Sequence, residues 1–214
     1  MKKLYISFFL CLTIILGSVS SHASSIVAGD YLGGGFLTNW SGATGYEFTV
    51  NSDITVIGLG VYDFSTSGLA SSHDIGIFLS DGTSVINTTI GNGSIGTYVP
   101  GTVDGSRFSS ISPTLLASGT TYFILGDNFN TDQYAYGNGS VVFAPEITWN
   151  SYVQTNSNSI FGSPVFRLPG QTGNLGPNFI YSTSPIPEPA TMLLFSIGLI
   201  ALVGVNRKKN EYHQ

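Results

Sequence analysis

His73 is the one histidine between Ser24 and Pro189, and Asp74 follows it directly. Histidine beside a carboxylate occurs in nucleophilic relays, where the carboxylate orients an imidazole that activates a serine. The chain has no G-x-S-x-G elbow to supply that serine. The pattern favours His73 as a turn or strand-edge residue that holds its neighbours by hydrogen bonds. We expect no catalytic residue here and, with one histidine and no cysteine, no zinc site of the usual kind.

Paired carboxylates are the second candidate for chemistry, because glycoside hydrolases need two of them at a defined separation. The available carboxylates include Glu47, Asp63, Asp127, Asp132 and Glu146. Several aspartates, however, stand where turns favour that residue, namely Asp53, Asp63, Asp81 and Asp104. We therefore expect a protein that is not an enzyme, and we keep a secreted glycan-active hydrolase as the alternative.

Residues 127–132, "DNFNTD", place oxygen-bearing side chains at intervals that a calcium ion could use. The candidate ligands are Asp127, Asn130 and Asp132. The stretch lacks the glycine and the distal bidentate glutamate of an EF-hand loop. An acidic, asparagine-rich loop without an ion is the alternative interpretation, and no other cofactor is expected.

Five aromatic residues stand in polar, turn-rich surroundings rather than in alternating segments: Trp40, Tyr134, Tyr136, Trp149 and Tyr152. Aromatic faces beside amide and carboxylate groups commonly form sugar-binding surfaces. These five residues are candidate glycan contacts. The alternative is that Trp149 fills the core while the tyrosines seal loop edges.

Short β-branched and aromatic segments separated by turn residues position these side chains. In residues 45–50, Tyr46, Phe48 and Val50 alternate with polar neighbours, which predicts one buried and one exposed face. Asp81-Gly82 predicts a tight hairpin, because both residues tolerate positive φ. The strands expected from these signals cover residues 45–50, 54–62, 74–80, 84–90, 107–111, 120–125, 140–143 and 165–168, after an edge strand in the Gly-rich lead-in 24–44.

Eight to ten such strands with no helical pattern between them predict an all-β fold. We expect an antiparallel β-sandwich, jelly-roll-like, as a single ectodomain over residues 24–181. A proline-containing linker follows over residues 182–189.

The N-terminus combines Lys2 and Lys3 with an apolar stretch over residues 4–16, then small residues ending at Ala23. This pattern predicts a signal peptide over residues 1–23, and hence signal peptidase and the Sec translocon as partners. The only cysteine, Cys11, lies inside it, so the mature chain forms no disulfide.

The mature chain is strongly acidic. Residues 24–189 carry eleven acidic side chains and two basic ones, a net charge of −9. Such a surface repels phosphate backbones, so nucleic-acid binding is not expected.

Pro187, Glu188 and Pro189 directly precede 16 uncharged residues, Ala190–Val205. At about 1.5 Å per residue this run covers about 24 Å, and the basic residues at 207–209 can snorkel to complete a membrane span. We expect a transmembrane helix over residues 190–206 and a cytoplasmic basic tail over residues 207–214. The two prolines hold Glu188 in an extended segment just outside the membrane.

This Pro-Glu-Pro motif, apolar helix and basic cluster resemble the PEP-CTERM sorting signal of bacterial exported proteins. The resemblance covers roughly residues 185–209. It implies that Pro187, Glu188 and Pro189 are recognised by an exosortase-like processing enzyme. It further implies transient anchoring in the inner membrane, followed by release to the cell surface or the extracellular matrix. A plain C-terminal anchor is the alternative.

The body of the chain resembles, more weakly, β-sandwich ectodomains of unknown function that carry this signal, in residues 45–63, 71–90 and 115–125. We therefore expect a structural or polysaccharide-associated surface protein, found in exopolysaccharide or biofilm material.

Overall fold

The computed structural model describes residues 24–37, 39–93, 95–136, 141–162, 165–168 and 175–183. The expected signal peptide, the Pro-Glu-Pro motif, the span over residues 190–206 and the tail lie outside these residues. The described residues contain no helix long and apolar enough to cross a membrane. They include almost no helix of any kind, a short 3₁₀ turn at Phe64–Thr66 being the exception.

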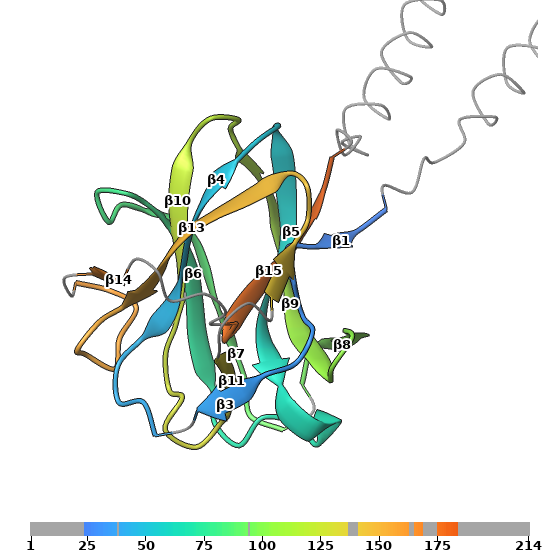
Figure 1. The fold of residues 1–214 in the computed structure, drawn as a ribbon, viewed down its shortest axis with the longest axis vertical. Helices are drawn as coiled ribbons and strands as arrows, with labels where there is room; N and C mark the ends of the chain where they lie inside the picture. Colours follow the sequence, from blue (N-terminus) through green and yellow to red (C-terminus); the bar gives the residue numbers. More distant parts are fainter. Residues whose placement is uncertain are drawn as a thin grey trace, which may run out of the picture.

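Two antiparallel sheets face each other as the layers of a sandwich (Figure 1). The five-stranded sheet holds, in spatial order, β1 (Ile26–Val27), β15 (Pro177–Ser182), β5 (Ile54–Asp63), β9 (Gly105–Leu116) and β8 (Thr97–Pro100). The six-stranded sheet holds β14 (Phe166–Leu168), β13 (Ile147–Gln154), β4 (Thr44–Val50), β10 (Thr121–Gly126), β6 (His73–Leu79) and β7 (Ser84–Ile90).

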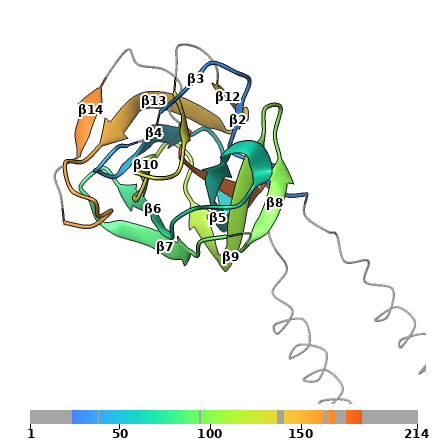
Figure 2. The same cartoon turned by 90° about the horizontal axis from the view of Figure 1, so that it is seen from below.

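Two small two-stranded sheets complete the fold. One pairs β2 (Gly29–Tyr31) with β12 (Val141–Phe143), and the other pairs β3 (Gly35–Leu37) with β11 (Tyr134–Tyr136). Figure 2 shows their strands β2, β3 and β12 along the upper side of the view. Every strand pair described is antiparallel, and the chain passes repeatedly from one large sheet to the other. The predicted all-β antiparallel sandwich is therefore confirmed.

The core lies between the two large sheets. On β4, Tyr46, Phe48 and Val50 are fully buried while Glu47 and Thr49 are half-buried, as the alternation predicts. The Phe48 ring lies 5.2 Å from the Phe179 ring, centroid to centroid, which joins β4 of one sheet to β15 of the other. Aromatic pairs at this spacing add to the free energy of simple area burial.

The predicted hairpin at Asp81-Gly82 is present between β6 and β7. Gly82 has φ of 89°, a conformation that costs glycine little. The Gly82 amide donates to the Leu79 carbonyl at 2.9 Å, and the Thr83 amide donates to Asp81 Oδ1 at 2.8 Å.

Four strands were not expected from the sequence: β8, β11, β13 and β15. On β13 the pairing register with β4 shifts between Trp149 and Ser151, so that Asn150 forms a bulge. A bulge inserts one residue and breaks the two-residue alternation that identifies a strand. The expectation that Trp149 and Tyr152 lie in turn-rich loops is therefore wrong: both lie on β13. Tyr134 and Tyr136 lie on β11.

Candidate functional site

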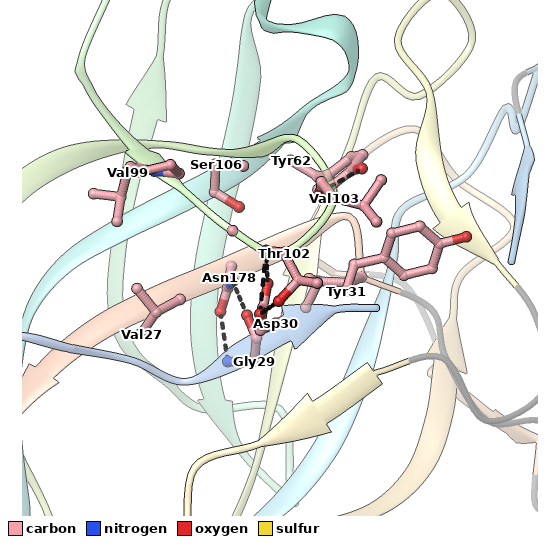
Figure 3. Close-up of a pocket in the computed structure, with 14 residues that line it drawn as sticks. Val27, Gly29, Asp30, Tyr31, Tyr62, Val99, Thr102, Val103, Ser106 and Asn178 are labelled. Carbon is pink, nitrogen blue, oxygen red and sulfur yellow. Dashed lines mark hydrogen bonds between the residues drawn. The ribbon is translucent and has the colours of Figure 1, made fainter. Parts of the chain in front are cut away.

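A pocket of about 300 Å³ opens on the outer face of the five-stranded sheet (Figure 3). Strand register explains its floor. Asn178 of β15 lies opposite Gly60 of β5, and Tyr62 of β5 lies opposite Ser106 of β9. Ser106 in turn lies opposite Val99 of β8. The alternate residues of β5, Leu59 and Val61, point the other way, into the core.

Strand β2 and the β8–β9 turn form the wall above this floor. The Asn178 side chain joins β2 to the sheet, because its Nδ2 donates to the Gly29 carbonyl at 2.8 Å and its Oδ1 accepts from the Gly29 amide at 3.3 Å. The turn is held in the same way, since the Thr102 amide donates to Asp30 Oδ1 at 3.0 Å. The Thr102 hydroxyl also donates to the Asp30 carboxylate. These bonds hold β2 against the sheet and the turn against β2.

Ser106 supplies the pocket's free polar group. Its side chain points toward the side on which Asn178 and Asp30 lie (Figure 3). The residue is 4% exposed, and its hydroxyl makes no hydrogen bond to any described part of the chain. A hydroxyl that lines a pocket without a partner in the chain is available to water or to a ligand. Asp30 adds a carboxylate, while Val27, Val99 and Leu175 add apolar surface.

His73, the residue expected to organise a turn or edge, is fully buried at the start of β6. Its Nδ1 lies 2.6 Å from the Asp127 carbonyl, and its Nε2 lies 3.0 Å from Asp132 Oδ2. Carbonyl and carboxylate oxygens only accept, so both ring nitrogens act as donors when both bonds form. Neither nitrogen is then available as a general base. Asp74, its sequence neighbour, bonds to Thr89 and not to the imidazole.

Asp132 ties two loops together. Its Oδ1 accepts from the Ala70 amide and its Oδ2 from the Ser71 amide, both at 2.8 Å. Burial acts to raise the pKa of the Asp132 carboxyl, but the hydrogen bonds from His73, Ala70 and Ser71 outweigh it, and the pKa lies below its ordinary value. The carboxylate is therefore held in its charged form.

The pKa of Asp127 shifts in the opposite direction to that of Asp132. Burial raises the pKa of its carboxyl, and the hydrogen bond from the Asp74 amide, at 2.8 Å, only partly offsets that effect. The proposed calcium ligands Asp127 and Asp132 are thus both engaged by the chain's own donors. Among the described residues no three histidine, cysteine, aspartate or glutamate side chains form a group that could hold a metal ion. Asn130 is exposed in the same loop.

The candidate glycan contacts do not share one surface environment. Tyr134 and Tyr152 are 2% and 4% exposed, so their rings have almost no face open to a sugar. Trp40 and Trp149 are half-buried and pack against the main core. The side chain of Tyr136 lies outside the described part of the structure. Two of the five candidates are therefore core residues in the structure.

The remaining candidate carboxylates serve the fold. Asp63 forms a buried ion pair with Arg107, Oδ2 to Nε at 2.6 Å. Glu47 accepts from Arg167 Nε at 2.6 Å. Glu146 accepts from the Tyr181 hydroxyl at 2.6 Å, and this bond, after burial, helps raise the pKa of Tyr181. Both basic side chains of the ectodomain are thus engaged with carboxylates.

Comparison with known families identifies the C-terminal segment. Residues 185–208 match the PEP-CTERM protein-sorting motif. No curated protein matches the chain. The chain therefore carries the sorting motif that Pro187, Glu188 and Pro189 suggested, behind an all-β sandwich. The motif marks an exported protein, sorted to the cell envelope or surface and processed by an exosortase-like enzyme.

The pocket residues Asp30, Thr102, Ser106 and Asn178 were not found by sequence reasoning. They come from β2, the β8–β9 turn, β9 and β15, and strand register together with the side-chain bonds of Asn178 and Asp30 brings them together. One signal was present. The glycines and the aspartate of "GTVDG" at 101–105 mark a turn, and binding residues often lie on turns and loops.

Proposed function

We propose that this chain is a non-enzymatic protein of the cell surface or extracellular matrix, whose β-sandwich associates with polysaccharide. The observation that carries the proposal is a sorting motif over residues 185–208 placed directly behind a sandwich that ends at Ser182. In this arrangement the C-terminal segment directs the sorting of the protein, and the sandwich is the part that functions outside the cell.

The proposed route has three steps. Residues 1–23 act as a signal peptide that engages the Sec translocon and signal peptidase. Residues 190–206 then anchor the chain in the inner membrane, with the basic tail inside. An exosortase-like enzyme finally recognises Glu188 between its two prolines and frees the ectodomain.

A role without catalysis is supported by how the carboxylates are used. The carboxylates of Asp74, Asp127 and Asp132 each accept a hydrogen bond from the chain itself, and Asp132 is the one of the three whose carboxylate meets the His73 ring. A glycosidase needs one carboxyl free to donate a proton and another free to act as nucleophile or base. The secreted glycan-active hydrolase stays the alternative.

Association with polysaccharide is tested by retention. The protein that cells release is passed over insoluble neutral and acidic polysaccharides, and the bound fraction is measured. We expect retention on a neutral polysaccharide and no new reducing ends after prolonged incubation. Absence of retention on every polysaccharide would overturn the association. Reducing ends that appear with the wild-type chain would support the hydrolase instead.

A further inference from the structure

We propose that the pocket above β15, β5, β9 and β8 binds one uncharged sugar ring, presented at the end or on a branch of a polysaccharide. This inference rests on the proposed function and names the site and the class of ligand. Four features of the described residues carry it: size, polar groups, apolar surface and charge.

Size limits the ligand to something small. A volume of about 300 Å³ lies at the lower end of ligand pockets, which span roughly 300 to 1,000 Å³. The wall formed by β2 and the β8–β9 turn closes one side, because Thr102 is bonded to Asp30 and the Val103 amide donates to the Tyr31 carbonyl at 3.2 Å. A walled pocket accepts a chain end or a side branch, whereas an internal stretch of polysaccharide requires an open groove.

The polar groups match a hydroxylated ligand. Ser106 is 4% exposed and lines the pocket, and its hydroxyl is unpaired among the described residues, so it can both donate to and accept from a ligand hydroxyl. Asp30 is oriented by Thr102, and a carboxylate has lone pairs beyond those that Thr102 uses. A sugar hydroxyl that donates to Asp30 and another that meets Ser106 would satisfy both groups.

The apolar surface matches the carbon–hydrogen face of a sugar ring. Val27 of β1, Val99 of β8 and Leu175 line the pocket beside these polar groups. A ligand that is polar on every side would leave this surface in contact with polar atoms. A pyranose ring presents hydroxyls at its rim and C–H groups on its face, so it fits both kinds of lining.

Charge excludes acidic sugars. Among the described residues no lysine or arginine lines the pocket, and residues 24–189 have a net charge of −9. Arg107 and Arg167, the two basic residues of that segment, are paired with Asp63 and Glu47. A uronate carboxylate placed beside Asp30 would meet repulsion with no cation to offset it. The site therefore selects neutral sugars over uronates.

The experiment is ligand-observed saturation-transfer NMR on the full chain, held in a detergent without a sugar headgroup. The probes are the methyl glycosides of glucose, galactose, mannose and glucuronic acid. We expect transfer to at least one neutral glycoside and none to the glucuronide. Ser106→Ala, which removes only the hydroxyl, should weaken that binding about fivefold. Ser106→Leu, which fills the pocket, should abolish it.

Ser110→Leu is the matched control, because Ser110 is exposed four residues further along the same face of β9, outside the pocket. Thermal unfolding of each variant shows whether the sandwich is intact. Binding that survives in an intact Ser106→Leu variant would overturn the site, as would preferential binding of the glucuronide. If Ser106→Leu does not fold, the fivefold effect of Ser106→Ala decides.

The outcome separates this inference from the proposed function. Retention on a neutral polysaccharide, with no glycoside transfer or with transfer that Ser106→Ala leaves unchanged, overturns the pocket and leaves the polysaccharide association standing. Transfer that Ser106→Ala weakens, without retention on any polysaccharide, supports the pocket and overturns the association. Absence of both overturns both.

Discussion

At the residue scale, two tyrosines in one core differ in a single hydrogen bond. Tyr46 and Tyr181 are both fully buried. The Tyr181 hydroxyl donates to Glu146, whereas the Tyr46 hydroxyl has no partner among the described residues. We predict that Tyr46→Phe leaves the free energy of unfolding unchanged or raises it by about 1 kcal/mol, because a desolvated hydroxyl is removed. Tyr181→Phe should lower it by about 1 to 2 kcal/mol, because a charged acceptor loses its donor. Urea unfolding of both variants measures the contrast, and an equal loss in both would contradict it.

The buried imidazole provides a second prediction at this scale. His73→Ala should lower the free energy of unfolding by about 3 kcal/mol, since it leaves the Asp132 carboxylate without its ring donor and opens space beside Phe129. A double-mutant cycle with Asp132→Ala should give a coupling of about 1 to 3 kcal/mol. If the two losses in the free energy of unfolding are additive, the contact between His73 and Asp132 contributes nothing to stability.

Acid should weaken the Asp132 bonds. The pKa of this carboxyl is lower in the folded chain, so its contribution to stability is complete above the ordinary pKa of aspartate and disappears as pH falls through the lowered value. Asp127, whose pKa is raised, opposes this trend. We predict that the stability difference between wild type and Asp132→Asn shrinks as pH falls below the ordinary pKa of aspartate, about 4. Guanidinium unfolding across that range measures it. The Asp53→Asn variant, at an exposed aspartate that accepts from the Ser118 amide, controls for loss of one charge.

At the element scale, β5 and β9 approach closely on their outer face. A Cβ added to Gly60 would lie 2.4 Å from Cδ1 of the Phe108 ring and 2.9 Å from the Arg107 carbonyl oxygen. Gly60→Ala should therefore lower the free energy of unfolding by about 2 kcal/mol through overpacking. Gly60→Ala should lower the free energy of unfolding less in a Phe108→Ala background than in the wild type, because the Phe108 ring is the nearer of the two obstacles. Thermal unfolding of the three variants tests this, and an equal loss in both backgrounds would place the strain in the backbone contact instead.

The sequence predicted elements well where alternation is unbroken. Residues 45–50 follow it closely, and they became β4. Residues 54–62 became β5 although their register with β9 shifts between Val56 and Gly58, because β-branched and other apolar residues fill the segment. Strand β13 was missed because the bulge at Asn150 shifts the pattern by one residue. The pocket was missed for a different reason: its residues come from separate strands, and register between strands cannot be seen in one linear pattern. Aromatic residues among polar neighbours were misleading, since Tyr134 and Tyr152 fill the core through strands that were not recognised.

At the scale of the whole molecule, the sorting motif and the β-sandwich are separate parts of one chain. The sandwich forms its core from residues between Ala28 and Tyr181, and the sorting motif begins at residue 185. We predict that Glu188→Ala changes both the C-terminal residue of the mature chain and its location in the cell. The fold of the sandwich should not change. Thermal unfolding of the two proteins should coincide.

The most direct test of the sorting claim is mass spectrometry of the C-terminus of the chain recovered from the cells that export it. The account predicts that the wild-type protein lacks the segment after the Pro-Glu-Pro motif, including Gln214, and that Glu188→Ala retains that segment and stays with the membrane. A mature protein that still ends at Gln214, in both the wild type and Glu188→Ala, would contradict it.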